Sequence, residues 1–548
     1  MQLVAYGAQD IYLTGNPQIT FFKVVYRRHT NFSVESIEQT FNGSAEFNKK
    51  MSCTISRNGD LLNRVYLETD VSSSSPISSI GNVAETSAGL ESLIQSLYGT
   101  GTATDAGTGA AWAQAGNAVP IGALSVSVDE NGVAKIGIDS THFSDTNLET
   151  DDNIVFTAVD GVLPSITATY GTPNADQWNV TVADNLGDGN ADVLATDATA
   201  VLSGSSGSGA TASSSVSVAT NGTLSVSSTL VNKGSNYKNE TLTVSMTVSG
   251  AAYTVGNVNA VVVDTSTDNY GFKILEYVEL EIGGQCIDKH YGEWMTLWTD
   301  LTHGGTGSTL LDRMISLENL QGGKSQKLYI PLQFWFCRNP GLALPLIALQ
   351  YHEVKINVQF ASAPVQHVSL DNMCVFCDYI FLDTDERRRF AQVSHEYLID
   401  QVQYSNAVNG GSGTTAQLEL RFNHPVKELV WTVEDDAATP EFRVVKDALL
   451  QLNGHDRFKR RMGDYFSTVQ RYQHHNGSTG SRRAHIYSFA LKPEEHQPSG
   501  SCNFSRIDNA VLNLSAKQAG HLKTIKVFAV NYNVLRIMSG MGGLAYSN

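Results

Sequence analysis

The stretch GNPQITFFKVVYRRHTNFSVESIEQTF (residues 15–41) leads into CTISRNGDLLNRVYLETD (residues 53–70), which reads as a β-strand that ends at Asp70. Further strand-rich stretches follow downstream, beyond one long interior segment, residues 71–265. In chain order they are VELEIGGQCIDKHYGEWM (278–295), LYIPLQFWFCRNPGLALPLIALQYHEVKINVQF (328–360), DYIFLDTDERRRFAQVSHEYLI (378–399) and the tail from Asp447.

Length and composition favour a folded protein of several domains. The chain has 548 residues, of which 41% are hydrophobic, enough for sizeable cores. It has no run of about 18 apolar residues, and its first ten residues, MQLVAYGAQD, lack the basic and apolar regions of a signal peptide. The six cysteines are scattered along strand-like runs. We therefore expect no membrane-spanning helix, no secretion, reduced thiols, and synthesis in the cytosol.

The acidity of the chain lies almost wholly in the interior segment. Residues 71–265 contain 18 acidic and three basic residues, a net charge of −15 in a chain whose total is −17. The remaining chain has 36 acidic and 34 basic residues, which is close to balance. A shift of this size marks a compositional boundary, and it predicts that residues 71–265 form a separate, solvated surface domain.

Alternating apolar residues predict that this acidic segment is a small β domain. Turn residues such as Asp160-Gly161 separate the alternating runs, which favours hairpins. The low-complexity run SGSSGSGATASSS (203–215) reads as one floppy loop. The predicted strands are residues 123–138, 153–170, 178–184, 222–229, 240–250 and 253–263.

The rest of the chain is weakly duplicated. VELEIGGQCIDKHYGEW recurs as LLQLNGHDRFKRRMGDYF, with Gly284 opposite Gly454 at an offset of 170 residues. Upstream of the acidic segment, NRVYLETD pairs with ELVWTVEDD at an offset of 365 residues. The difference, 195 residues, equals the length of the acidic segment. Two similar units are therefore predicted, the first of which contains the insertion. KLYIPL with HIYSFAL, and VKINV with VLNLS, are further pairs.

The quoted stretches resemble, in sequence, order and spacing, the major capsid proteins of nucleo-cytoplasmic large DNA viruses, such as those of algal and protist giant viruses. The resemblance implies an all-β fold of two consecutive eight-stranded antiparallel jelly rolls, with a large β-rich insertion in the first. The insertion would lie between the fourth and fifth strands, in the D-E loop. The expected divisions are an N-terminal arm (1–19), a first roll (20–70 plus 266–395), the inserted domain (71–265) and a second roll (396–548).

No pattern in the sequence indicates an enzyme, a cofactor site or a catalytic residue. The chain lacks a phosphate-binding glycine loop, a nucleophile elbow and an H-E-x-x-H motif. Cys374 and Cys377 have C-x-x-C spacing but read as part of a strand, so a structural role is favoured over a zinc or redox site. Asp184, Asp188, Asn190 and Asp192 are spaced somewhat like a calcium loop; a surface turn is the favoured reading, and weak calcium binding stays open.

Two basic clusters also have alternative readings. Arg387, Arg388 and Arg389 follow three acidic residues, which favours ion pairs between domains or subunits over nucleic-acid binding. A second cluster could face a neighbouring capsomer, a minor protein or the virion interior, or be a solvated surface. The aromatic residues Phe334, Trp335 and Phe336 are predicted to lie in the core. The second cluster comprises Lys459, Arg460, Arg461, Arg482 and Arg483.

The resemblance implies a structural function: self-assembly into pseudo-hexagonal homotrimeric capsomers that tile an icosahedral virion shell. Implied partners are further copies, minor capsid and penton proteins and an inner viral membrane, with no specific nucleic acid. The alternative is a glycan-binding β-sandwich attachment protein, in which Trp112, Trp178 and Tyr170 of the insert would stack on sugars. Catalytic, cofactor-binding and metal sites are expected to be absent.

Overall fold

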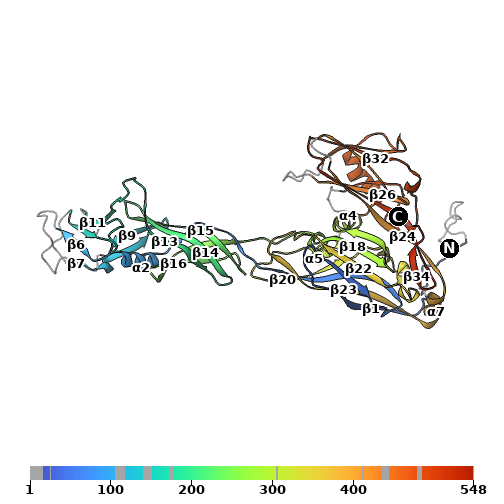
Figure 1. Cartoon of the computed structure of the whole chain (residues 1–548), viewed down its shortest axis with the longest axis horizontal. Helices are drawn as coiled ribbons and strands as arrows, with labels where there is room; N and C mark the ends of the chain where they lie inside the picture. Colours follow the sequence, from blue (N-terminus) through green and yellow to red (C-terminus); the bar gives the residue numbers. More distant parts are fainter. Residues whose placement is uncertain are drawn as a thin grey trace, which may run out of the picture.

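The structure is a computed structural model that describes residues 16–24, 26, 28–104, 118–139, 151–171, 178–303, 306–409, 413–434, 444–477 and 484–546. These residues form two jelly rolls that lie against each other, and a long arm that projects from the first roll (Figure 1). The all-β fold with two rolls and a β-rich insertion is therefore confirmed. No helix of the described residues is long and apolar enough to span a membrane.

The first roll is a sandwich of two antiparallel sheets, with strand orders β1-β23-β3-β20 and β19-β18-β22-β2. Strand β3 shows why these residues form strands, since every second side chain along it is buried. The eight strands are β1 (Phe32–Thr40), β2 (Lys50–Ile55), β3 (Leu61–Ser73), β18 (Leu275–Ile282), β19 (Gln285–Tyr291), β20 (Ser325–Pro331), β22 (Val354–Phe360) and β23 (Val368–Leu382).

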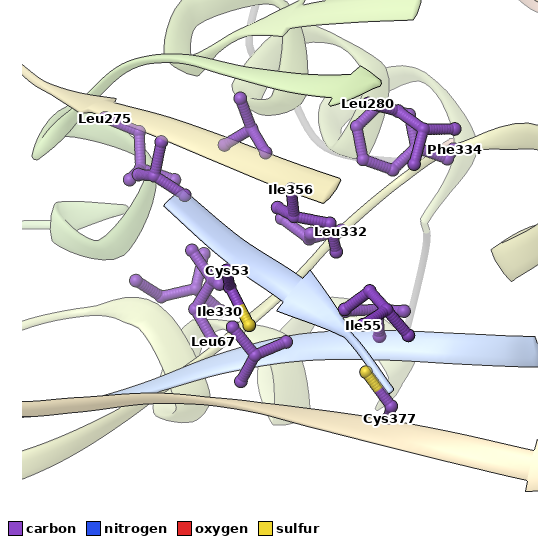
Figure 2. Close-up of a cluster of buried hydrophobic side chains, with 14 of the residues drawn as sticks. Cys53, Ile55, Leu67, Leu275, Leu280, Ile330, Leu332, Phe334, Ile356 and Cys377 are labelled. Atoms are coloured by element: carbon purple, nitrogen blue, oxygen red, sulfur yellow. The ribbon is translucent and has the colours of Figure 1, made fainter. Parts of the chain in front are cut away.

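Apolar side chains from both sheets meet in the core of the first roll. Figure 2 shows Cys53 and Ile356 from one sheet together with Leu67 and Cys377 from the other. Phe334, Trp335 and Phe336 belong to the same core and are almost wholly buried, so the prediction for these three residues is confirmed.

Short helices fill the connections of the first roll. The residues from Pro340 to Ala348 form two 3-10 turns separated by a two-residue strand. The elements are α3 (Tyr270–Lys273), α4 (Gly292–Thr302), α5 (Thr306–Ile315), α6 (Trp335–Arg338), η4 (Pro340–Leu342), β21 (Leu344–Pro345), η5 (Leu346–Ala348) and α7 (Thr384–Gln392).

The second roll repeats the first, with strand orders β24-β33-β26-β30 and β25-β32-β27-β28. Its main strands are β24 (His395–Asn409), β25 (Thr415–Glu419), β26 (Pro425–Glu434), β27 (Val445–Leu452), β28 (His455–Asp456), β30 (His485–Ser488), β32 (Ala510–Ala516) and β33 (Thr524–Met538). Shorter elements are β29 (Arg461–Met462), the π-helix η6 (Tyr465–Val469), α8 (Gln470–His474), β31 (Cys502–Asn503), η7 (Phe504–Arg506) and β34 (Met541–Leu544).

The predicted duplication matches the topology. The paired motifs form β18 and β27, β20 and β30, β22 and β32, and β3 and β26, and each pair holds the same place in its sheet. Gly284 and Gly454 both end two-residue hairpin turns in which both residues have positive φ, at 58° and 85° in the first roll and 51° and 77° in the second. Such turns match the twist of antiparallel strands and favour glycine.

The insert has its own core, formed only by residues between Ile77 and Val262. A large sheet has the order β4-β17-β16-β13-β14-β15-β9-β8, and a second has the order β12-β11-β10-β6-β7. Its elements are β4 (Ile77–Ile80), β5 (Ala84–Glu85), α2 (Ser87–Leu97), β6 (Gly101–Thr104), β7 (Ala118–Val119), η2 (Ile121–Ala123), β8 (Leu124–Val128), β9 (Ala134–Ile138), β10 (Asn153–Phe156), β11 (Ile166–Tyr170), β12 (Trp178–Val182), β13 (Asp192–Ser203), β14 (Ser208–Val218), β15 (Thr223–Ser235), β16 (Thr241–Val248) and β17 (Ala251–Val262).

The two chain crossings between the first roll and the insert lie side by side, since Val263 N–H donates to the Pro76 carbonyl at 3.2 Å. The insert also contacts the first roll beside these crossings, where Gly322 N–H donates to the Tyr237 carbonyl at 2.9 Å and Asn239 N–H donates to the Gln321 side chain at 3.3 Å. In the described residues three strands of the roll, β1, β2 and β3, precede the insert, whereas the sequence analysis placed four before it. Residues 1–15 lie outside the described range.

The prediction of a floppy loop at residues 203–215 is wrong. Most of this run belongs to β14, which pairs with β13 on one side and β15 on the other. Ala210, Ala212 and Ser214 point inward and are buried, since small side chains fit where the sheet meets the core. A low-complexity run of Ser, Gly and Ala therefore forms an interior strand, with its backbone groups bonded on both sides.

Candidate functional site: the assembly surfaces

Helix α4 of the first roll joins the two rolls by lying against a sheet of the second. Its apolar residues recur at intervals of three and four, so that one helix face is apolar. That face packs on β24, β26, β30 and β33, in a cluster separate from the cores of the two rolls. The cluster comprises Trp294, Leu297, Trp298, Leu301, Val402, Val430, Ala484, Ile486, Phe528 and Val530.

Polar groups fix the register of this junction. The Asp288 carboxylate accepts a hydrogen bond from the Val402 backbone N–H at 3.1 Å, and the Gln401 side-chain amide donates to the Ile287 carbonyl. His290 Nε2 lies 2.9 Å from the second oxygen of Asp288, and both side chains are buried. These hydrogen bonds hold strands β19 and β24 at one relative position where the two rolls meet.

A buried lysine forms the centre of an ion-pair network beside the junction. Lys427 Nζ lies 3.3 Å from both carboxylate oxygens of Asp400. Arg338 Nη1 lies 3.7 Å from Asp400, and its guanidinium group stacks over the Trp298 ring at 4.5 Å. Burial lowers the pKa of Lys427, and Asp400 opposes that shift. The carboxylate thus joins a cation of the first roll to a cation of the second.

A buried histidine lies between two carboxylates of the second roll. His475 Nε2 is 2.8 Å from Glu428 and Nδ1 is 2.9 Å from Glu494. Burial alone would lower the pKa of His475, but Glu428 and Glu494 outweigh burial and raise it to about 9. The ring is therefore protonated at neutral pH and neutralises part of the buried negative charge.

Sequence reasoning missed this junction. The periodicity of GEWMTLWTDLT, with Trp294, Leu297, Trp298 and Leu301 on one face, is a detectable signal for α4. The ionic partners carry no local signal, because they come from strands and loops far apart in the sequence.

The six cysteines are free thiols in the part of the chain that the structure describes. Cys374 and Cys377 both lie on β23, three positions apart in an unbroken pairing with β1, so they point to opposite faces of the sheet. Cys53 is buried, and burial raises its pKa to about 11. Cys286 is exposed in β19, beside a hairpin turn, and Cys337 is half-buried in α6.

The four residues of the calcium-like spacing form a turn. Asp184 accepts hydrogen bonds from the backbone N–H groups of Gly187 and Gly189 at 2.7 and 2.8 Å. The Asn190 N–H donates to Asp188 at 2.8 Å and lowers the pKa of that carboxyl group, and the Asn185 N–H donates to Asp192. In the described ranges no group of three or more His, Cys, Asp or Glu side chains could hold a metal ion.

The basic clusters are partly paired within the chain. Arg387 Nε lies 3.0 Å from Asp60, so this pair lies inside the first roll rather than between domains or subunits. Arg460 pairs with Asp447 at 2.5 Å, and Arg461 lies over the Tyr465 ring at 4.1 Å. Arg482 and Arg483 lie outside the described residues.

The aromatic residues proposed for sugar stacking do not form an open platform. Tyr170 and Trp178 face each other across β11 and β12, with ring centroids 5.2 Å apart in an edge-on arrangement. Trp178 also packs against the core of the insert. Trp112 lies outside the described residues.

Comparisons with known proteins agree with one another. The family described as "Large eukaryotic DNA virus major capsid protein" matches residues 386–543, and "Major capsid protein N-terminus" matches residues 20–96 and 210–383. The chain is 37% identical to a major capsid protein of Pyramimonas orientalis virus and 32% identical to that of Paramecium bursaria Chlorella virus 1, over 100% of this chain and 99% of each relative.

Solved structures give the same result. A chain described as PBCV-1 VP54 is 28% identical, with a TM-score of 0.58 over 96% of this chain and 100% of that one. A chain of the PBCV-1 virus capsid is 29% identical, with a TM-score of 0.57 and the same coverage. These comparisons give no support to the glycan-binding alternative.

Proposed function

The chain belongs to the major capsid proteins of large eukaryotic DNA viruses and forms the virion shell; from this premise we propose that it assembles as a pseudo-hexagonal homotrimer that tiles an icosahedral lattice. The observation that carries the proposal is the repetition of one strand order in two joined rolls. Three copies related by a threefold axis then present six similar edges, which is the outline that a hexagonal array needs.

The chain would be divided by role as the sequence analysis expects. The two rolls form the tile, and residues 71–265 form an outward-facing appendage in the D-E loop. Two observations support this division: the insert has a core of its own, and its two ends lie side by side at Pro76 and Val263. Residues 1–19 would be an arm beneath the tile.

Proposed partners are neighbouring capsomers, minor capsid and penton proteins, and an inner viral membrane that faces the end opposite the insert. The chain would act without catalysis, cofactor or specific nucleic acid, and would be made in the host cytoplasm. The chain would function by burying surface between neighbouring copies. The residues that matter for this function would be those that give the edges of the rolls complementary shape and charge.

Light scattering after gel filtration of the purified full chain tests the trimer. The expected mass is three times the 59.3 kDa of one chain. Negative-stain images of the same peak should show pseudo-hexagonal particles. A single-chain mass at micromolar concentration, or a dimer, would overturn the trimer and leave the family assignment intact.

A further inference from the structure

A run of large apolar side chains before β1 lies almost wholly in solvent. The exposed fractions run from 70% to 99%, and the five side chains lie within eight consecutive positions of the sequence. Contiguous exposed apolar groups of this kind mark binding surfaces. We call residues 16–31 the basic-aromatic segment. Its exposed apolar residues are Ile19, Phe21, Phe22, Val24 and Tyr26.

The charge of this region is opposite to that of the chain. Residues 11–34 contain Lys23, Arg27 and Arg28 and no acidic residue, whereas the chain as a whole carries −17. Lys23 and Arg28 are exposed beside the exposed aromatic rings. The segment therefore combines apolar anchors with cations.

The topology places this segment at the pole opposite the acidic insert. Strand β3 runs from Leu61 to Ser73, and Ser73 leads to the insert. Ile380 of β23 pairs with Leu61, and Leu382 pairs with Phe32 at the start of β1. Phe32 therefore lies at the end of β3 away from the insert, about 40 Å from Ser73 at 3.3 Å per residue. Figure 1 shows the insert at one end of the molecule and β1 toward the other.

The exposed surface continues into β1 itself. In the described residues β1 pairs only with β23, so its outer edge is open. Phe32 and Val34 are each about half exposed. The first roll thus leaves the outer edge of β1 and the half-exposed Phe32 and Val34 uncovered beside the basic-aromatic segment.

We propose that the basic-aromatic segment binds the surface of an anionic lipid bilayer. Aromatic and aliphatic side chains insert at the boundary between headgroups and acyl chains, while Lys and Arg are attracted to anionic headgroups. A nucleic acid would satisfy the cations, and its bases could stack on the aromatic rings, but it would leave the aliphatic Ile19 and Val24 in water, whereas a bilayer takes up all five apolar side chains. This inference rests on the proposed function, since it names the element by which the inner face of the tile meets a membrane.

Flotation of the purified full-length protein with lipid vesicles tests the inference. Vesicles of phosphatidylcholine alone are compared with vesicles that contain phosphatidylserine at three parts in ten. Wild-type protein should float with the anionic vesicles. Phe21→Ser/Phe22→Ser should lower binding at least about tenfold, and Lys23→Glu/Arg28→Glu should lower it about tenfold on anionic vesicles only.

Matched controls carry the same changes elsewhere on the surface. Tyr472→Ser/Leu491→Ser removes two apolar side chains that are 89% and 75% exposed on the second roll. Lys446→Glu/Lys459→Glu reverses two exposed charges there. Both controls should float as the wild type does.

Gel filtration of every variant keeps the two proposals distinct. A wild-type trimer that stays at the bottom of the gradient with anionic vesicles overturns the inference and spares the trimer. Loss of the trimer in Phe21→Ser/Phe22→Ser overturns it in favour of a contact with a second copy. The wild type could instead be a monomer that floats with anionic vesicles and stops floating when Phe21 and Phe22 are changed. That result supports lipid binding and overturns the homotrimer proposal.

Discussion

His475 Nε2 lies 2.8 Å from Glu428 Oε2 in the second roll, and neither side chain exposes any surface to solvent. Glu494 accepts from the other ring nitrogen, so a doubly protonated ring satisfies both carboxylates. A neutral ring could donate to only one of the two carboxylates. Glu494 would keep the hydrogen bonds that it accepts from the Asn476 backbone and side-chain N–H groups, but the buried Glu428 charge would lose the cation that offsets it, which is costly in an apolar interior.

This arrangement predicts a loss of stability at alkaline pH. The pKa of His475 rises from an ordinary 6.5 to about 9 in the folded protein. A raised pKa stabilises the fold fully below pH 6.5 and loses that contribution as pH rises through 9, a loss on the order of 3 kcal/mol. Thermal melting between pH 6.5 and 10 should show a steep fall. His475→Gln should flatten the fall, while His474→Gln, at the neighbouring half-buried position, should leave it unchanged. Parallel curves for wild type and His475→Gln would contradict the assignment.

The buried Lys427–Asp400 pair predicts a sharp difference between two lysine substitutions. Lys427→Met leaves Asp400 buried with only the more distant Arg338, and the free energy of unfolding should fall by about 3 kcal/mol. Lys492→Met breaks an exposed pair with Glu495, which is 2.8 Å long, and should leave the free energy of unfolding almost unchanged. Urea denaturation measures both. Equal losses would show that the buried network contributes no more than a surface ion pair.

Because Pro76 and Val263 lie side by side, we predict that the insert can be removed between them. Deletion of residues 77–262, with a two-glycine link between Pro76 and Val263, leaves β3 whole and should give a soluble trimer. Deletion of residues 71–265 also removes the end of β3, including the buried Val71, so its melting temperature should be several degrees lower. Gel filtration and thermal melting compare the two. An aggregated product from the shorter deletion would show that the first roll needs the insert to fold.

The charge of the insert predicts a salt effect on the trimer. Three inserts of net charge −15 repel one another if they lie close together, and salt screens that repulsion, with a Debye length of about 10 Å at 0.1 M. The full-length trimer should therefore gain more thermal stability between 0.05 and 0.5 M NaCl than the 77–262 deletion. Identical salt responses would show that the inserts stand too far apart to interact.

The sequence pattern predicted two similar strand-rich units because their evidence is local and repeated, and the family resemblance then implied that each unit is a jelly roll. The alternation along β3 and the turn glycines Gly284 and Gly454 are dictated by short-range geometry that recurs in both rolls. The junction was missed for the opposite reason. Lys427 and Asp400, or His475 and Glu428, become partners only when distant strands pack, and a charged residue in a strand looks exposed until its neighbour is known.

Residues 203–215 show a different failure. Serine, glycine and alanine are typical of flexible linkers, yet Ala210 and Ala212 are buried in β14, where small side chains allow close approach to the core. Amino-acid composition indicates how much apolar surface a segment can bury. Strand β14 is held instead by backbone hydrogen bonds to β13 and β15, and composition carries no information on those bonds.

Val263 N–H lies 3.2 Å from the Pro76 carbonyl oxygen, so the two ends of the insert lie side by side. Sequence changes within the insert can therefore be separated from changes within the two rolls. The domain between these residues leaves and re-enters the first roll at neighbouring positions, and its Tyr237 and Asn239 also bond to Gly322 and Gln321 of that roll. If the insert projects outward as proposed, its size and shape can change while the strands of the two rolls stay the same. The same two positions are an insertion site for protein engineering. A foreign domain whose two ends lie side by side can replace the native insert between Pro76 and Val263, so that every copy of the protein displays it once.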